Sequence, residues 1–374
     1  MKSFDIAIIG GGLSGSSTAL NLSKKGYSVI ILEKEVTRSF IPCAGGMASS
    51  MKKFLPFEID KAIETEVKKV DFTWKFSDRV IADLSGESPF WIIKREILDE
   101  LLQKEASSYG AEIIKPITVK ELKNKNELWQ ITCNDKNIYE SKFLVIADGS
   151  ESKWTNHLKL GPKNPKFANT VGLKLEGLGN IERDSARFDF GSVQLGFTWA
   201  FPLREFTNIG IGTFIGDFYP NEPTLINKVV KDFGFTEQKY KPIYKRLRIW
   251  SGNNKIHNER VLAVGDAASL CDPFLAEGIR PSLLSSFYAA ECIDKCLSQR
   301  TNDLSDYSKI MHMKWGESMI WGKRIAKVFY RFPRTGYKLG VKRKTAPQRI
   351  AQILSGEMNY SDIAKRVIRR LLLR

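Results

Sequence analysis

The chain has 374 residues, a length that fits two domains or one elaborated α/β domain. Hydrophobic residues make up 43% of it, enough for a sizeable core, and five scattered cysteines argue against a secreted disulfide framework and for a reducing, cytoplasmic compartment. With three histidines and no C-x-x-C pair, the composition also argues against a zinc site, so we expect no metal.

The positive charge is concentrated near the C-terminus. Residues 320–374 include 15 Lys and Arg against Glu357 and Asp362, so they hold +13 of the net charge of +16. No stretch approaches the roughly 20 apolar residues of a membrane span. The opening "MKSFDIAIIGGG" has too short an apolar run for a signal peptide, and we expect a strand there.

The first thirty residues alternate strand, glycine turn, helix and strand. Gly10, Gly12 and Gly15 form G-x-G-x-x-G, and Glu33 ends the second strand. In this motif Gly10 permits the tight turn, Gly12 lets the backbone approach a pyrophosphate, and Gly15 lets helix and strand pack closely. Ser14 lies near the helix N-terminus, whose free N–H groups would face the phosphates, and Glu33 can accept hydrogen bonds from a ribose. The unit predicts dinucleotide binding; a chance glycine turn is the alternative.

Two later strands end in an acidic residue. The stretch "KFLVIADGSES" ends a strand at Asp148 and Gly149, and "ERVLAVGDAASLCDPFLAEGI" ends one at Gly265 and Asp266 before a run of small residues. Alone, "GDAAS" also fits a capped helix start. Taken with the first unit, the two segments resemble the FAD-dependent flavoproteins that include p-hydroxybenzoate hydroxylase.

That resemblance implies FAD as the cofactor and gives roles to particular residues. It implies that Asp266 reaches the ribityl chain and that the small residues after it let the backbone approach the isoalloxazine. It also implies that Arg95, between a strand and an amphipathic helix, reaches the phosphates, and that Val119 lies near the adenine end. A surface arginine is the alternative for Arg95. The remaining cofactor contacts that we expect are Asp148, Gly149, Gly265, Gly278 and Ile279.

The expected fold class is α/β (α+β overall), with a Rossmann-like FAD-binding domain formed by residues 1–70, 90–165 and 255–300. Residues 71–89 and 166–254 are rich in aromatic and β-branched positions, which predicts antiparallel strands of an inserted substrate domain. Residues 301–374 predict a helical, basic C-terminal region.

Two further stretches carry a narrower resemblance. The stretch "PCAGGM", Pro42 to Met47, follows the first βαβ unit, and "FTWAFP" is followed seven residues later by "GIG". Both are similar to elements of the geranylgeranyl reductase family, over about residues 1–330. The second element helps to form that family's substrate cavity, and its matching residues are Phe197, Trp199, Phe201, Pro202, Gly210 and Gly212. The first implies flavin contacts from Ala44, Gly45 and Met47.

Two points stay open: the departures from the family pattern, and the alternative that the aromatic stretch is an ordinary core strand. Ala44 and Ala276 stand where the family commonly has glycine. Strand alternation would put Phe197, Trp199 and Phe201 on one face, as a core strand also would, and the resemblance favours a cavity wall. A polyprenyl chain has few polar groups, so its affinity must come from buried apolar area, about 25 cal/mol per Å².

The resemblance implies that reduced FAD gives a hydride from N5 to an isolated double bond of a geranylgeranyl or polyprenyl lipid, while another group supplies a proton. Cys43 is the candidate proton donor or hydrogen-bonding group near the flavin; a small buried thiol is the alternative. NADPH or a ferredoxin would supply electrons. Alternative functions are an FAD-dependent monooxygenase or hydroxylase on an apolar substrate, and a non-catalytic, flavin-bearing, membrane-associated electron-relay protein.

The final stretch "YSDIAKRVIRRLLLR" predicts a basic amphipathic helix. Ile363, Val367 and Leu371 recur every four residues between lysines and arginines. Such a helix often binds an anionic membrane surface, so we expect a peripheral membrane protein that meets its isoprenoid lipid substrate there. A helix that packs back on the body is the alternative. We expect no nucleic acid partner, because no reader domain is visible, and we expect a monomer.

Overall fold

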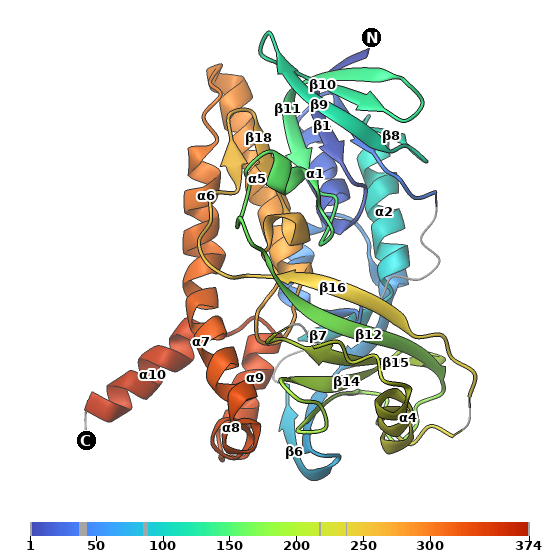
Figure 1. Cartoon of the computed structure of the whole chain (residues 1–374), viewed down its shortest axis with the longest axis vertical. Coiled ribbons are helices and arrows are strands. Elements are labelled where there is room, and N and C mark those ends of the chain that lie inside the picture. The colour runs from blue at the N-terminus through green and yellow to red at the C-terminus, as the bar shows by residue number, and fades with distance from the viewer. Residues whose placement is uncertain (1, 37–42, 85–88, 217, 237, 373–374) are drawn as a thin grey trace.

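The computed structural model describes residues 2–36, 43–84, 89–216, 218–236 and 238–372 (Figure 1). Two large sheets lie toward opposite ends of the molecule, and helices run along the flanks between them. Pro42 of "PCAGGM" lies outside the described residues. The mixed α/β fold class that the sequence predicts is confirmed.

The first sheet is largely parallel and begins with the N-terminal strand. Its strands run in the order β17 (His257–Asn258), β18 (Val261–Ala263), β11 (Ile138–Ile146), β1 (Lys2–Ile9), β2 (Val29–Leu32) and β8 (Glu112–Ile114), and the hairpin of β9 (Val119–Lys125) and β10 (Leu128–Cys133) extends it from β11. The central pairs β1–β2 and β1–β11 are parallel. Ile6, Ala7 and Ile8 are fully buried, as expected of a strand with both faces covered.

Three helices cover this sheet and bring distant segments together. They are α1 (Leu13–Ser23), α2 (Arg95–Ser108) and α5 (Ile279–Gln299), and α1 packs against both of the others. The α1 and α5 helices both begin at a glycine, Gly12 and Gly278 respectively. Because both N-termini face one cavity, the sheet and its helices fix one end of the candidate site.

The second sheet has strands in the order β16 (Ile243–Ile249), β12 (Lys166–Glu176), β15 (Phe206–Thr213), β14 (Gly196–Pro202), β13 (Ser185–Phe190), β5 (Lys69–Trp74) and β6 (Ser77–Asp83). Most neighbours are antiparallel, as the sequence predicts, but β13 and β5 are parallel, so that expectation is wrong for this pair. The two strands lie more than 100 residues apart in the chain, and no local turn fixes their relative direction.

The two faces of the second sheet are both buried, against different partners. One face packs on α4 (Pro223–Asp232) through a separate apolar cluster that includes Val171, Ile209 and Ile211. The other face carries the aromatic residues Phe188 and Phe197, which belong to the main core. Alternation along each strand therefore separates an aliphatic face from an aromatic one.

A small third sheet and a run of helices complete the fold. The small sheet consists of β3 (Gly46–Ala48), β7 (Phe90–Ile93) and β4 (Ile63–Val67). The C-terminal helices are α6 (Ser305–Met311), α7 (Glu317–Arg331), α8 (Pro333–Gly340), α9 (Ala346–Leu354) and α10 (Tyr360–Leu372), with a π-helical turn at His312–Gly316. None of the helices in the described part of the chain has the length and apolar character needed to span a bilayer.

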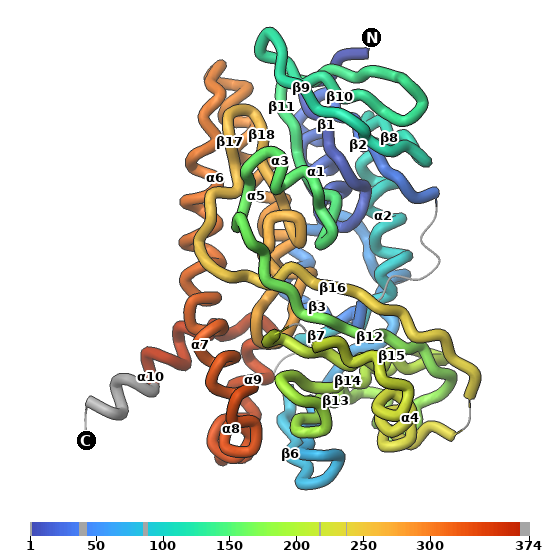
Figure 2. The backbone as a smooth tube through the Cα atoms, viewed as in Figure 1, coloured from blue at the N-terminus to red at the C-terminus, as the bar shows by residue number. Residues whose placement is uncertain are grey.

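Figure 2 shows how the chain passes between the two ends of the molecule. The light-blue segment that contains β6 lies at the end opposite β9 and β10, beside the orange-red α8. The α2 helix then leads back toward the first sheet. As a result, the residues between 43 and 95 belong to both ends of the molecule.

Candidate functional site

The glycine turn after β1 has little space for side chains. Gly10 has a φ of +101°, and a Cβ there would overlap the carbonyl of Ala147. A Cβ on Gly15 would overlap the carbonyl of Gly10. These contacts fit the steric roles that the motif predicts, and they leave Gly12 at the N-cap of α1, on the wall of the cavity.

Glu33 lies at the end of β2, directly beside this turn. Its carboxylate accepts hydrogen bonds from the backbone N–H groups of Gly11, at 2.5 Å, and Glu35, at 2.9 Å. The residue is only 3% exposed, yet it lines the cavity. The position is suitable for recognition of a ribose, as the sequence predicts, because the carboxylate is held in place by the backbone.

Asp148 and Asp266 come from separate strand ends and line the same cavity. The Asp148 Oδ1 atom is buried and has no hydrogen-bond partner among the described residues. Burial raises the pKa of the Asp148 carboxyl. A buried acceptor without a partner is unusual in a folded protein, and a ligand hydroxyl in the cavity would satisfy it.

Gly265 touches the glycine turn, although 250 residues separate the two. It has a φ of +56°, and a Cβ there would overlap the Ser14 hydroxyl. Ser286 of α5 donates a hydrogen bond to the Ser14 carbonyl at 2.7 Å. The strand end at Gly265 is followed by a 3-10 turn over Gly265–Ala268, and α5 starts only at Ile279. The turn after β1 and the segment that begins at Gly265 thus pack directly against each other.

The loop that contains Cys43 also lines the cavity. Gly45 has a φ of +85°, and a Cβ there would overlap the Ile93 carbonyl of β7. The Cys43 carbonyl accepts a hydrogen bond from Asn208 Nδ2 at 3.4 Å, which joins the loop to β15. Ala44 does not have a positive φ, so alanine fits there without the backbone freedom of glycine.

Arg95 lies at the start of α2, beside this loop. Its guanidinium lies 3.6 Å from the Cys43 Sγ atom and 3.1 Å from Asp99 Oδ1. Burial alone would lower the pKa of Arg95, but the neighbouring Asp99 and Cys43 raise it. The alternative of a surface arginine is therefore wrong: the side chain is 13% exposed and lines the cavity.

An aromatic wall forms the other end of the cavity. Phe197, Trp199 and Phe201 project from one face of β14 into the cavity. Trp199 pairs with Gly210 of β15, and a Cβ on Gly210 would overlap its indole ring. A Cβ on Gly212 would lie 3.1 Å from the same ring. The two glycines therefore let the indole lie across β15.

These elements enclose one continuous cavity of about 780 Å³. This volume is typical of a small-molecule site. The predicted residues on its walls are Gly10, Gly12, Ser14, Glu33, Cys43, Ala44, Gly45, Arg95, Val119, Asp148, Gly149, Asp266, Gly278, Ile279, Phe197, Trp199 and Phe201. Six predicted residues are not part of the lining: Gly15, Met47, Gly265, Pro202, Gly210 and Gly212. The four glycines among them let neighbouring segments approach closely.

Sequence reasoning missed Glu277, which lies on the cavity wall between Ala276 and Gly278. Burial raises the pKa of its carboxyl to about 7, against the effect of Arg280, whose Nε lies 2.8 Å away. Arg280 also donates hydrogen bonds to the carbonyls of Ile353 and Leu354 at the end of α9. The sequence offers one signal for Glu277 as a site residue: it is the acidic residue in the stretch "AEGI".

Comparison with known proteins finds related sequences. Residues 5–39 match the family model described as FAD dependent oxidoreductase. A digeranylgeranylglycerophospholipid reductase of Thermoplasma volcanium is 25% identical over 339 residues, which cover 84% of this chain and 83% of the relative.

Solved structures show the same fold. A geranylgeranyl bacteriochlorophyll reductase-like protein from Thermoplasma acidophilum has a TM-score of 0.80 at 19% identity, over 88% of each chain. The flavin-dependent brominase Bmp2 has a TM-score of 0.71 at 17% identity, over 99% of this chain and 100% of that one. The fold is therefore shared with flavoproteins of a different activity. The chain is therefore a flavin-dependent oxidoreductase whose sequence and fold resemble those of the geranylgeranyl reductases.

Proposed function

We propose that the protein uses FAD to reduce isolated double bonds of a geranylgeranyl or other polyprenyl lipid. The observation that carries this proposal is the continuity of the cavity from the nucleotide turn to the aromatic wall. A single space of this kind can hold a dinucleotide and an apolar chain in contact. Similarity to digeranylgeranylglycerophospholipid reductases supports the same substrate class.

The nucleotide end would hold the FAD. Residues at the start of α1, Gly12 to Ser14, line the cavity, and the N-terminus of a helix suits a pyrophosphate, while Glu33 suits the adenosine ribose. The unpartnered oxygen of Asp148 and the carboxylate of Asp266 would accept hydrogen bonds from further hydroxyl groups. Arg95 is placed to bind the phosphates only if it leaves or shares its contacts with Asp99 and Cys43.

The aromatic end would bind the lipid. The rings of Phe188 and Phe201 lie 5.3 Å apart at 74°, and those of Phe188 and Phe197 lie 5.8 Å apart. Aromatic side chains lose little conformational entropy on binding, so such a wall offers apolar contact area at low cost. It also excludes water from the reacting carbons.

Reduced FAD, when bound, would supply a hydride to one carbon of the double bond, and the protein would have to supply a proton to the second carbon. Two groups on the cavity can do so. The Cys43 thiol lies beside the Arg95 guanidinium, which would stabilise the thiolate left behind. The Glu277 carboxyl has a pKa of about 7, so a large share of it is protonated at neutral pH. The sequence-based choice of Cys43 stays a prediction, and Glu277 is the alternative donor.

The test follows anaerobic reoxidation of the reduced, FAD-loaded enzyme by a geranylgeranyl lipid in detergent. Cys43→Ala should slow reoxidation at least 100-fold if the thiol gives the proton. Glu277→Gln serves as the matched variant. An unchanged rate in Cys43→Ala and Cys43→Ser would remove Cys43 from the mechanism. Mass spectrometry of the lipid should show a gain of two hydrogen atoms per reduced bond.

The same lipid assay, repeated in the presence of oxygen, separates the alternative functions. A monooxygenase or hydroxylase would consume oxygen with NAD(P)H and give an oxygenated product. An electron-relay protein would show reducible FAD with no change in lipid saturation. NADPH and reduced ferredoxin, compared as electron sources, would identify the donor.

We also propose that the protein works at an anionic membrane surface as a peripheral, cytoplasmic monomer. The sequence of α10 supports this, because its basic residues flank a regular apolar repeat. Lys365 and Arg366, near its middle, are exposed. Light scattering of the purified protein would test the monomer, and nucleic acid is not expected to compete with vesicles.

A further inference from the structure

A second surface, separate from α10, combines exposed apolar and basic side chains. The α7 and α8 helices meet at Phe332, and we define the α7–α8 elbow as residues 323–344. Val328 is 63% exposed, Phe332 60% and Leu339 53%. Large apolar side chains exposed so close together along the chain often mark an interaction site.

The charge around these apolar residues has one sign. Residues 318–356 contain ten Lys and Arg and no Asp or Glu. Lys327, Arg331 and Lys338 are exposed, and none of them forms an ion pair with a residue that the structure describes. Lys342 of the elbow pairs with Asp78, but these three residues offer positive charge that no described acidic side chain neutralises.

The inner side of the elbow packs on the aromatic wall. Phe329 lies 5.0 Å from Phe190, and Tyr330 stacks 6.4 Å from Phe197 at an interplanar angle of 15°. Phe197 lines the cavity. One helix thus separates the basic, apolar surface from the proposed lipid-binding wall.

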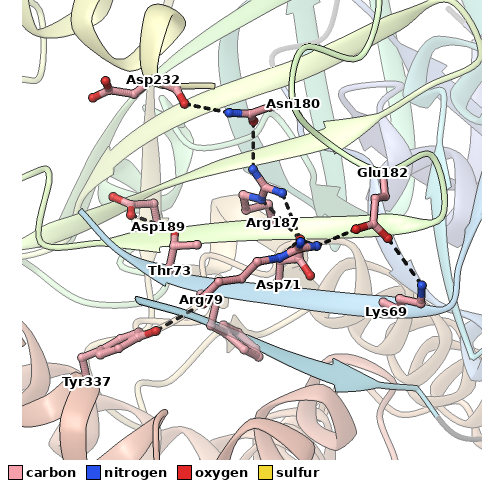
Figure 3. A network of polar contacts seen from close by, with 11 residues as sticks. Lys69, Asp71, Thr73, Arg79, Asn180, Glu182, Arg187, Asp189, Asp232 and Tyr337 are labelled. Atoms are coloured by element: carbon pink, nitrogen blue, oxygen red, sulfur yellow. Dashed lines mark hydrogen bonds and ion pairs between the residues drawn. The ribbon is translucent and has the colours of Figure 1, made fainter. Parts of the chain in front are cut away.

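The elbow is also fixed to the second sheet. The Tyr337 hydroxyl of α8 donates hydrogen bonds to the carbonyls of Phe72 and Asp78, and Lys342 forms an ion pair with Asp78 at 2.6 Å. Figure 3 shows Tyr337 reaching the strands that carry the buried Asp71–Arg187 ion pair and the exposed Arg79, which also pairs with Asp71. A surface held in this way can bind a partner without first becoming ordered.

We propose that the α7–α8 elbow is a docking surface for an anionic lipid bilayer. Lysines and arginines around exposed Val, Phe and Leu suit lipid headgroups and the acyl region beneath them, whereas a nucleic acid would gain nothing from the apolar residues. The inference rests on the proposed function at one point: the bilayer would also supply the lipid substrate. Docking would leave only α7 between the aromatic wall and the membrane.

The experiment measures binding of the full-length, FAD-loaded protein to vesicles of phosphatidylcholine and phosphatidylserine in equal parts. The elbow variant combines Lys327→Gln, Arg331→Gln and Lys338→Gln. Each basic residue near an anionic surface contributes about fivefold, so the variant should bind roughly 100-fold more weakly. Phe332→Ser with Val328→Ser should weaken binding even at high salt, because the contribution of these side chains is not electrostatic.

Two matched variants control for net charge and for α10. Lys120→Gln, Lys125→Gln and Lys136→Gln remove the same charge from the β9–β10 end, and binding should remain within about threefold of wild type. The second control variant combines Lys365→Gln, Arg366→Gln and Arg369→Gln, and it removes three positive charges from α10. Equal losses in the elbow and β9–β10 variants, or wild-type binding by the elbow variant, would overturn the proposal.

The catalytic assay in detergent distinguishes this inference from the proposed function. The elbow variant should keep its FAD content and its rate with detergent-dispersed lipid, because no bilayer is needed there. Loss of vesicle binding with a normal detergent rate supports docking at the elbow. Wild-type protein that does not bind vesicles but reduces lipid in detergent would overturn docking and leave the proposed function intact.

Discussion

At the turn after β1, glycines are required because a Cβ would overlap backbone atoms. On β15 they are required because a Cβ would overlap a side chain of the neighbouring strand β14. Gly10 and Gly15 avoid carbonyl groups close to them in the fold. Gly210 makes room for the indole of Trp199. Gly10 and Gly15 therefore tolerate no larger residue, while Gly210 could be replaced by alanine if the aromatic residue were smaller. Substitutions at Gly15 and Gly210 test this difference directly, and two more, at Glu277 and Ala276, probe the loop between the two ends.

The largest effect is expected for Gly15→Ala, at the nucleotide end. Its Cβ would overlap the Gly10 carbonyl, and backbone on both sides would have to shift. We expect a loss of about 4 kcal/mol in the free energy of unfolding, together with loss of bound FAD. Denaturant unfolding and flavin absorbance measure both. Gly252→Ala is the control, because the nearest atom to its Cβ would be 4.0 Å away. Equal behaviour of the two variants would contradict the steric argument.

The next effect concerns Glu277, in the loop between the two ends. Its pKa of about 7 lies above the ordinary value of 4.5, so the folded state holds the proton more tightly than the unfolded state. The stability that this contributes is complete below pH 4.5 and is lost as the pH rises through about 7. The free energy of unfolding of wild type, relative to Glu277→Gln, should fall by about 3 kcal/mol over that range. Parallel pH profiles of the two proteins would contradict it.

At the wall, Gly210→Ala should cost about 2 kcal/mol, because the Trp199 ring must move. In a Trp199→Leu background the same substitution should cost less than about 0.5 kcal/mol. A double-mutant cycle of unfolding free energies gives this difference directly. If the cost were the same in both backgrounds, the glycine would be required by the backbone here too, and the contrast with Gly15 would disappear.

The smallest effect is expected at Ala276, one of the two departures from the family pattern. Its φ is +58°, a conformation that favours glycine. Ala276→Gly should raise the free energy of unfolding by about 0.5–1 kcal/mol, since relief of strain exceeds the added entropy of the unfolded chain. Ala44→Gly is the matched control and should not stabilise the protein, because the φ of Ala44 is not positive. Thermal unfolding of both variants measures the two changes in stability.

The sequence allows more to be predicted at the nucleotide end than at the wall. Gly10, Gly15 and Glu33 follow a spacing whose geometry is set within one βαβ unit, so their arrangement can be read locally. Glu277 could not be identified in that way, because its importance comes from burial beside Arg280 and α9. The reason for Gly210 also depends on strand register, which the alternation of residues does not specify.

The position of Arg95 shows the same limit. Its place at the junction of β7 and α2 could be predicted, but its contact with Cys43 joins segments that are 52 residues apart. The elbow was missed because the sequence shows the amount of basic charge and not its exposure. Sequence reasoning placed that charge in residues 320–374 but assigned membrane binding to the final helix alone, whereas much of the charge lies on α7 and α8.

The parallel pairing of β5 with β13 has a consequence for modular engineering. Residues 69–83 supply the last two strands of a sheet whose other strands come from 166–249. A segment cut at 166 and 254 would carry the whole aromatic strand β14, but it would leave the edge of β13 open to pairing with other chains. Exchange of substrate preference between relatives would therefore require both pieces to be transplanted together.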